Sequence, residues 1–123
     1  MSIGGLFDDP STSAVYEAMQ GLWAQQQADA NNVANINTPG YKAQDVSFES
    51  SLAQAVSAGD PAQTQITSTT STAPADQVGN NVNLSTEMVG EEKAGLQFQT
   101  MVDAMNAKFN LLSTAISEQP SGN

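Results

Sequence analysis

The chain contains no cysteine and no histidine, and these two absences remove much of the chemistry that small proteins use. Disulfides, reactive thiolates, zinc sites of the usual ligand types and imidazole catalysis are all excluded. Hydrophobic residues make up 39% of the 123 positions and aromatic residues 6%, which is thin for a compact core of that length. The sequence therefore predicts at most one domain, with no cofactor, no metal and no enzymatic activity.

Positive charge is also scarce. Arginine is absent, the three lysines (Lys42, Lys93 and Lys108) are scattered, and the formal net charge is −10. Such a chain repels nucleic acid phosphates and anionic lipid, so no nucleic acid is expected as a partner. No window approaches the roughly 18 apolar residues of a membrane span, and residues 1–10 carry no basic residue. We expect no direct membrane insertion, and either a cytoplasmic protein or one exported without a cleaved signal.

The first helical pattern begins near Asp9 and Pro10. Asp9 is a candidate N-cap and Pro10 suits the first helical position, while Ser11 and Ser13 are alternative caps. An apolar stripe at spacings of three and four follows, interrupted by polar residues in its second half. Its members are Val15, Met19, Leu22, Val33 and Ile36.

An asparagine-rich stretch, ANNVANINTPGYK, closes this pattern at residues 30–42. Pro39 presets φ near −65° and Gly40 supplies a positive φ, so residues 38–41 are predicted to form a type II turn. The asparagines are expected to hydrogen-bond nearby backbone where the helix unwinds. From composition alone, a helix end followed by a solvated loop is the simpler interpretation.

The next segment is ambiguous and the one after it is polar. Val46 and Phe48 alternate as in a strand, whereas Phe48 and Leu52 have the spacing of a helical turn, so both interpretations stay open. Residues 53–77 are rich in Ala, Gln, Ser, Thr, Gly and Pro, and cannot bury enough apolar area to offset ordering. We expect this segment to be disordered in the free chain.

The last helical pattern is the most regular. No proline occurs between Leu84 and Ile116, and Asn83 or Ser85 can cap the start. A four-three repeat forms a heptad seam. Its members are Leu84, Met88, Glu91, Gly95, Phe98, Val102, Met105, Phe109, Leu112 and Ile116.

The expected fold is mainly α, with two long amphipathic terminal helices that pair in a coiled-coil-like arrangement around a polar, largely disordered middle. We divide the chain into residues 1–52, 53–82 and 83–123, all within one structural unit. Two helices cannot cover every face of Phe98, Met101, Met105 and Phe109, so apolar surface remains for neighbours. The chain is then either an antiparallel hairpin that dimerises or a subunit that buries its helices in a polymer.

Two motifs carry a resemblance to flagellar axial proteins. The 30–42 string is similar to the N-terminal signature of rod, hook and hook-associated proteins. The run GNNVNL at 79–84, with Glu87, Met88, Lys108 and Phe109, resembles the C-terminal region of the proximal rod (FlgB) family. The matching N-terminal positions are Asn31, Asn32, Ala34, Asn35, Thr38, Pro39, Gly40, Tyr41, Lys42, Asp45 and Phe48.

The resemblance implies a structural subunit of the flagellar basal-body rod, exported without a cleaved signal through the flagellum's own type III apparatus. It implies contacts with copies of itself, with FlgC-like rod proteins, with a FliE-like basal adaptor and with the export apparatus. The helix stripes then act as an assembly seam. Its residues are Val15, Met19, Leu22, Leu84, Met88, Phe98, Val102, Met105, Phe109, Leu112 and Ile116.

A second class of protein also fits the helix pattern: a small secreted, dimeric helical-hairpin module. Such modules place a Trp-x-Gly in the turn between their helices. Here Gly21 precedes Trp23 inside the first helix, and the region between the helices is long and polar. These two features favour the rod subunit. The absence of arginine departs from the family pattern, and with a charge of −10 it predicts self-association that salt promotes.

Overall fold

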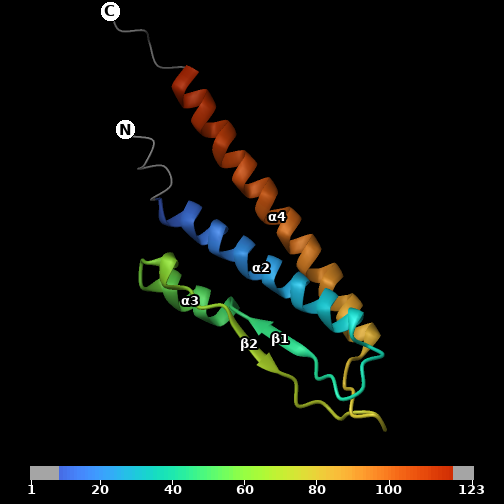
Figure 1. Ribbon diagram of the computed structural model, residues 1–123. Helices are drawn as coiled ribbons and strands as arrows, with labels where there is room; N and C mark the ends of the chain where they lie inside the picture. The colour runs from blue at the N-terminus through green and yellow to red at the C-terminus, as the bar shows by residue number, and fades with distance from the viewer. Residues whose placement is uncertain (1–8, 118–123) are drawn as a thin grey trace, which may run out of the picture.

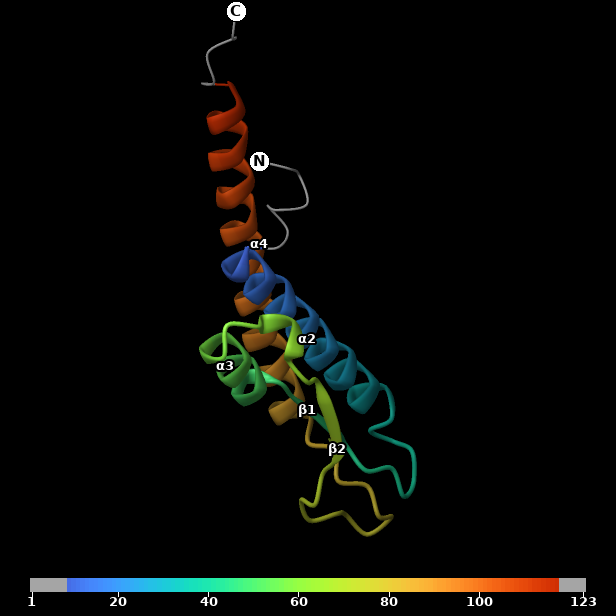
Figure 2. The ribbon, with the colours of Figure 1, turned by 90° about the vertical axis from the view of Figure 1, so that its left-hand side faces the viewer.

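Two long helices dominate the computed structural model, which describes residues 9–117. The helix α4 runs antiparallel beside α2 and extends past the start of α2 (Figures 1 and 2). The predicted mainly helical fold with two long terminal helices is confirmed. The elements in chain order are α2 (Pro10–Ala34), β1 (Gln44–Ser47), α3 (Glu49–Ser57), the 3-10 turn η1 (Pro61–Gln63), β2 (Thr67–Thr70) and α4 (Leu84–Ser117).

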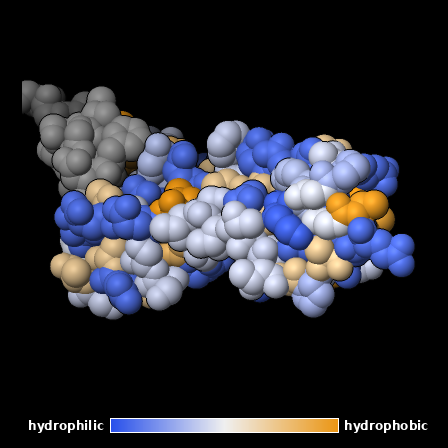
Figure 3. All heavy atoms as spheres, turned by 60° about the horizontal axis from the view of Figure 1, so that its bottom comes forward, coloured by the Kyte–Doolittle hydropathy of each residue, from blue (hydrophilic) through white to orange (hydrophobic). Residues whose placement is uncertain are grey.

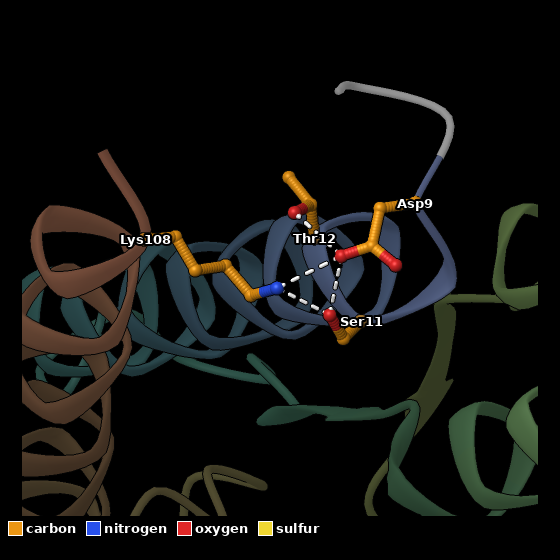
Figure 4. Close-up of polar contacts among 4 residues, drawn as sticks. All are labelled: Asp9, Ser11, Thr12 and Lys108. Atoms are coloured by element: carbon orange, nitrogen blue, oxygen red, sulfur yellow. Dashed lines mark hydrogen bonds and ion pairs between the residues drawn. The ribbon is translucent and has the colours of Figure 1, made fainter. Parts of the chain in front are cut away.

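Both long helices begin where the sequence predicts. Asp9 is the N-cap of α2 and Pro10 occupies its first turn. The Asp9 carboxylate accepts no backbone N–H. It accepts hydrogen bonds from Ser11 Oγ at 2.6 Å and from Lys108 Nζ at 2.9 Å, so it ties the start of α2 to α4 (Figure 4). These two hydrogen bonds, from Ser11 first and Lys108 second, hold the pKa of Asp9 well below its usual range.

The start of α4 is capped by Asn83. Its Oδ1 accepts a hydrogen bond of 3.1 Å from the backbone N–H of Thr86, which satisfies one of the free donors of the first turn. The helix then continues for 34 residues without a break. At about 1.5 Å per residue it reaches on the order of 50 Å. The predicted length and cap are confirmed.

The ambiguous segment around Phe48 contains both a strand and a helix. Val46 lies in β1, Leu52 lies in α3, and the backbone changes direction at Phe48, the residue before α3. The Phe48 side chain is only 4% exposed and packs with Ala18, Leu22 and Ala94, where α2 and α4 meet.

Gly21 makes room for that ring. A Cβ atom at this position would lie 2.3 Å from the Phe48 ring, far inside van der Waals contact. The helix α2 therefore accepts the junction of β1 and α3 at its surface only because residue 21 has no side chain. The cluster around Phe48 also contacts Leu52, Phe98 and Met101, and it forms the apolar centre of the molecule.

The structure does not confirm the predicted disorder of residues 53–77. This segment contains the end of α3, η1 and β2, and β2 pairs antiparallel with β1 in the register Gln44↔Thr70 to Ser47↔Thr67. Every residue of β2 is exposed, so apolar burial does not hold it. Backbone pairing with β1, itself packed on α2, supplies the order instead.

The surface matches the low hydrophobic content of the sequence. Figure 3 shows one face on which hydrophilic residues dominate and the hydrophobic ones are scattered between them. In the described part of the chain, no helix is long and apolar enough to cross a membrane.

Candidate functional site

Two asparagine-rich segments that are far apart in sequence contact each other next to the C-terminal end of α2 and the N-terminal end of α4. The first is 31–42 and the second is 78–83, and we call their contact the asparagine clasp. The Asn80 side chain donates hydrogen bonds to the backbone oxygens of Asn35 at 2.9 Å and Thr38 at 2.8 Å. Its Oδ1 accepts from Val82 N–H at 2.8 Å. Asn80 is only 4% exposed, so these hydrogen bonds replace the ones that its side chain would make with water in the unfolded chain.

Asn81 makes the matching contact on the strand side. Its Oδ1 accepts a hydrogen bond of 2.7 Å from Ala43 N–H, just before β1. Its Nδ2 donates to the backbone oxygens of Ser71 and Ala73, both at 3.1 Å, just after β2. One amide therefore joins the start of β1, the end of β2 and the approach to α4.

The predicted type II turn lies inside the clasp and is confirmed. The Tyr41 N–H donates to Thr38 O at 3.2 Å, and Gly40 has φ +75°. Gly40 N–H then donates to Val78 O at 2.8 Å, so the turn also holds the second segment. Lys42 Nζ donates to Gly79 O at 2.7 Å on the same side.

Asn32 is the most buried side chain of the region, with no exposed surface. Its Oδ1 accepts from Gln44 N–H at 2.9 Å and from Tyr41 Oη at 3.2 Å. Its Nδ2 donates to Gln44 O at 3.0 Å and to Glu87 Oε2 at 2.9 Å. All four hydrogen-bonding positions of the amide are used, and they link α2, β1 and α4.

An acidic pair lies next to Asn32. Glu87 is 6% exposed, and Asp29 lies one helical turn before Asn32 on the same face of α2. Burial first, then a hydrogen bond and charge repulsion from Glu87, raise the pKa of Asp29 to about 7. Within residues 9–117, no group of three or more histidine, cysteine, aspartate or glutamate residues is arranged to hold a metal ion.

Comparison with known proteins decides the family. A family model described as "Flagella basal body rod protein" matches residues 16–42, which cover most of α2 and the type II turn. The flagellar basal body rod protein FlgB of Bacillus subtilis (strain 168) is 36% identical over 106 residues, covering 76% of this chain and 82% of that protein. The chain belongs to the FlgB family.

FlgB-family membership establishes the function at the level of the organelle. The chain is a structural subunit of the flagellar basal-body rod, not an enzyme, and it works in assembly with other basal-body components. The predictions of a rod-protein family, a structural role in the rod and a location in the flagellar basal body are confirmed. The matched residues 16–42 end inside the asparagine clasp, so the N-terminal half of the clasp lies within the family pattern.

The other motif residues of this FlgB-family chain have simpler places. Asn31, Ala34 and Pro39 are exposed, and Asn35 ends α2 as its C-cap with Nδ2 donating to Asn31 O at 2.8 Å. Of the asparagines expected to bond locally, Asn35 does so, whereas Asn32 makes long-range contacts instead. Asn32 lies four residues after the buried Ala28 and so on the same face of α2, although the apolar stripe predicted from the sequence passes through Val33 instead.

The residues of the predicted assembly seam divide into two sets. Leu22 is buried, and six others are partly buried: Val15, Met19, Phe98, Val102, Met105 and Leu112. Four are exposed: Leu84, Met88, Phe109 and Ile116. At the start of α4 the buried positions are Glu87 and Ala94, which sequence reasoning did not assign to this contact. The two glycines of α4, Gly90 and Gly95, approach Asp29 and Gln26 of α2.

Proposed function

We propose that this FlgB-family subunit completes its packing only inside the rod, where α2 and α4 join a coiled-coil-like layer with neighbouring subunits. The observation that carries this proposal is the imbalance between a very small core and a large exposed apolar surface. Among residues 9–117, seven hydrophobic residues are buried, and five of them are alanines. Alanine removes little apolar area from water, so the free subunit gains little stability from this core.

The exposed apolar side chains lie mainly on the two long helices. Tyr16 and Trp23 are seven residues apart on α2 and are each more than half exposed. On α4, Val89 is 64% exposed and Leu96 is 68% exposed. Further exposed members of α4 are Leu84, Met88, Phe109, Leu111 and Ile116. Surfaces of this kind mark sites of protein association.

The proposed neighbours are further copies of the chain, a FlgC-like rod protein and a FliE-like adaptor at the rod base. We also propose export through the flagellar type III apparatus without a cleaved signal. Family membership supports both, and a small alanine core that unfolds at low cost suits a chain that is exported unfolded. With a net charge of −10, contacts between copies need cations or basic partners to offset repulsion.

Deletion of the gene in its source bacterium, followed by electron cryotomography of the basal bodies, tests the role in the rod. Membrane rings without a rod, restored by the intact chain, are the expected result. Complete flagella in a deletion strain that has no second copy would contradict the proposal.

Serine substitution of exposed residues tests the assembly surface. The variant Met88→Ser/Val89→Ser/Leu96→Ser removes apolar surface from α4 without touching the buried cluster. The matched control Gln97→Ser/Gln99→Ser/Asn106→Ser places three serines at exposed polar positions of the same helix. We expect equal helical circular dichroism for both proteins and rod assembly only for the control. Normal swimming of cells that carry the first variant would show that this face of α4 is not needed for rod assembly.

A further inference from the structure

Carboxyl groups from three elements meet where α2, α4 and β1 come together, beside the asparagine clasp. The contact between the helices has two levels, one helical turn apart. At one level Asn32 Nδ2 donates to Glu87 Oε2 at 2.9 Å. At the other, Asp29 lies so close to Gly90 that a Cβ atom there would be 3.0 Å from Asp29 Oδ2. Asp29 and Glu87 therefore lie side by side between the two helices.

Few positive charges are available to balance this pair. Lys42 is engaged with Gly79 O and Lys108 with Asp9, which leaves Lys93 among the lysines of the chain. Lys93 lines a cleft of about 220 Å³ into which Asp29 also faces. The charged groups around Asp29 are Glu87, Glu91 and Lys93 of α4, Asp45 of β1 and Glu49 of α3.

We propose that the Asp29–Glu87 pair is a proton-dependent latch, which holds the clasp end of α2 against α4 when the pair carries one proton and loosens it when both groups are ionised. The protonated pair forms a hydrogen bond between the two carboxyl groups, and the ionised pair places two negative charges together at a partly buried contact. This inference concerns the folded subunit itself and goes beyond its assembly into the rod.

The direction of the pH effect follows from the raised pKa of Asp29, which is about 7 in the folded chain. An unfolded aspartate titrates near 3.9, so between about pH 4 and pH 7 the folded state holds a proton that the unfolded state has released. The latch therefore stabilises the fold fully below about pH 4, and its contribution is lost as the pH rises through about 7.

The carboxylates of Asp9 and Glu49 change the folding stability with pH in the opposite direction to Asp29, and they do so at lower pH. Hydrogen bonds from Ser11 and Lys108 lower the pKa of Asp9. Burial of Glu49 raises its pKa, but a hydrogen bond from Gln25 and other contacts outweigh burial, so the pKa of Glu49 is lowered overall. Both groups stabilise the fold above their unfolded values, and that stability is lost as the pH falls. A change in folding stability between about pH 5 and pH 8 therefore reports mainly the titration of Asp29.

Urea unfolding of the full chain, followed by circular dichroism at about pH 5 and pH 8, tests the latch. Asp29→Asn is a neutral isostere of the protonated group. Glu92→Gln removes one negative charge at an exposed position of α4 and serves as the matched control. We expect the unfolding equilibrium constant of the wild type to rise from pH 5 to pH 8 by a factor approaching a hundredfold, which is what a folded pKa of about 7 and an unfolded pKa of about 3.9 give. Asp29→Asn should abolish most of that rise, and Glu92→Gln should retain it.

Two results would overturn the proposal. One is a wild-type stability that does not fall from about pH 5 to pH 8, and the other is an equal pH slope in Asp29→Asn and Glu92→Gln. Titration of the carboxyl carbon of Asp29 by NMR gives a second measurement that does not depend on two-state unfolding. A midpoint near neutrality is expected, and a midpoint near 4 would exclude the latch.

Discussion

Asn32 donates a hydrogen bond of 2.9 Å to Glu87, a residue 55 positions further along the chain, and both side chains are buried. This bond joins the last turns of α2 to the first turn of α4. It is the point where the two sequence motifs of the FlgB-family chain act on the same structure, one in 30–42 and the other in 79–88.

Asn32→Ala should destabilise the fold by about 2–4 kcal/mol. The substitution removes the partner of Gln44 N–H and one partner of the buried Glu87 carboxyl, and the loss of hydrogen bonds to buried polar groups is costly. Chemical denaturation measures the loss. Asn31→Ala is the control, because Asn31 is the exposed neighbour in the same helix and should change stability by less than about 0.5 kcal/mol. Equal effects of the two substitutions would show that the Asn32 amide is not central.

Gly21→Ala should cost about 1–3 kcal/mol, because its Cβ would lie 2.3 Å from the Phe48 ring and force the β1–α3 junction away from α2. The control is Gly95→Ala, where the nearest atom is the flexible end of Gln26 at 3.3 Å. There the gain in helix propensity, about 1 kcal/mol, should offset the closer contact. Thermal unfolding compares the two, and a neutral Gly21→Ala would contradict the packing described.

Gly40→Val should damage rod assembly and motility. Gly40 has φ +75°, a backbone conformation that a β-branched residue resists, and the turn holds Val78. Gly40→Asn is the control, since asparagine tolerates this conformation much better. Swimming assays in a complemented deletion strain give the result. Normal motility with valine would mean that the turn is not required in the assembled rod.

Self-association of the purified subunit should be weak at low ionic strength and should strengthen with salt. The net charge of −10 makes copies repel each other, and screening shortens that repulsion severalfold between about 10 mM and 500 mM salt. Sedimentation velocity at the two salt concentrations measures the change. At equal ionic strength, sodium chloride and a salt with a weaker salting-out effect should promote association equally if screening is the cause. Equal association at low and high ionic strength would refute the prediction.

Local chemistry was enough to predict the ends of the helices and the turn. Pro10 after Asp9, and Asn83 before an uninterrupted helical repeat, identify the helix starts, because the preference of proline for the first turn and the side-chain cap of Asn83 each depend on a few adjacent residues. The type II turn was predictable for the same reason, since Pro39 and Gly40 restrict their own φ angles. The seam at the start of α4 was less predictable, because Glu87 is buried through partners that lie in α2 and no periodic apolar pattern contains it.

By itself, the sequence determined the two long helices, their caps, the turn and the family, since each rests on neighbouring residues or on a recognisable string. Only the tertiary structure decided that β2 is ordered, that Asn80 and Asn81 close a clasp on the first motif, and that Asp29 meets Glu87. Each of these contacts joins segments separated by many residues. Their stability comes from hydrogen bonds formed across that separation, a free energy that no local pattern encodes.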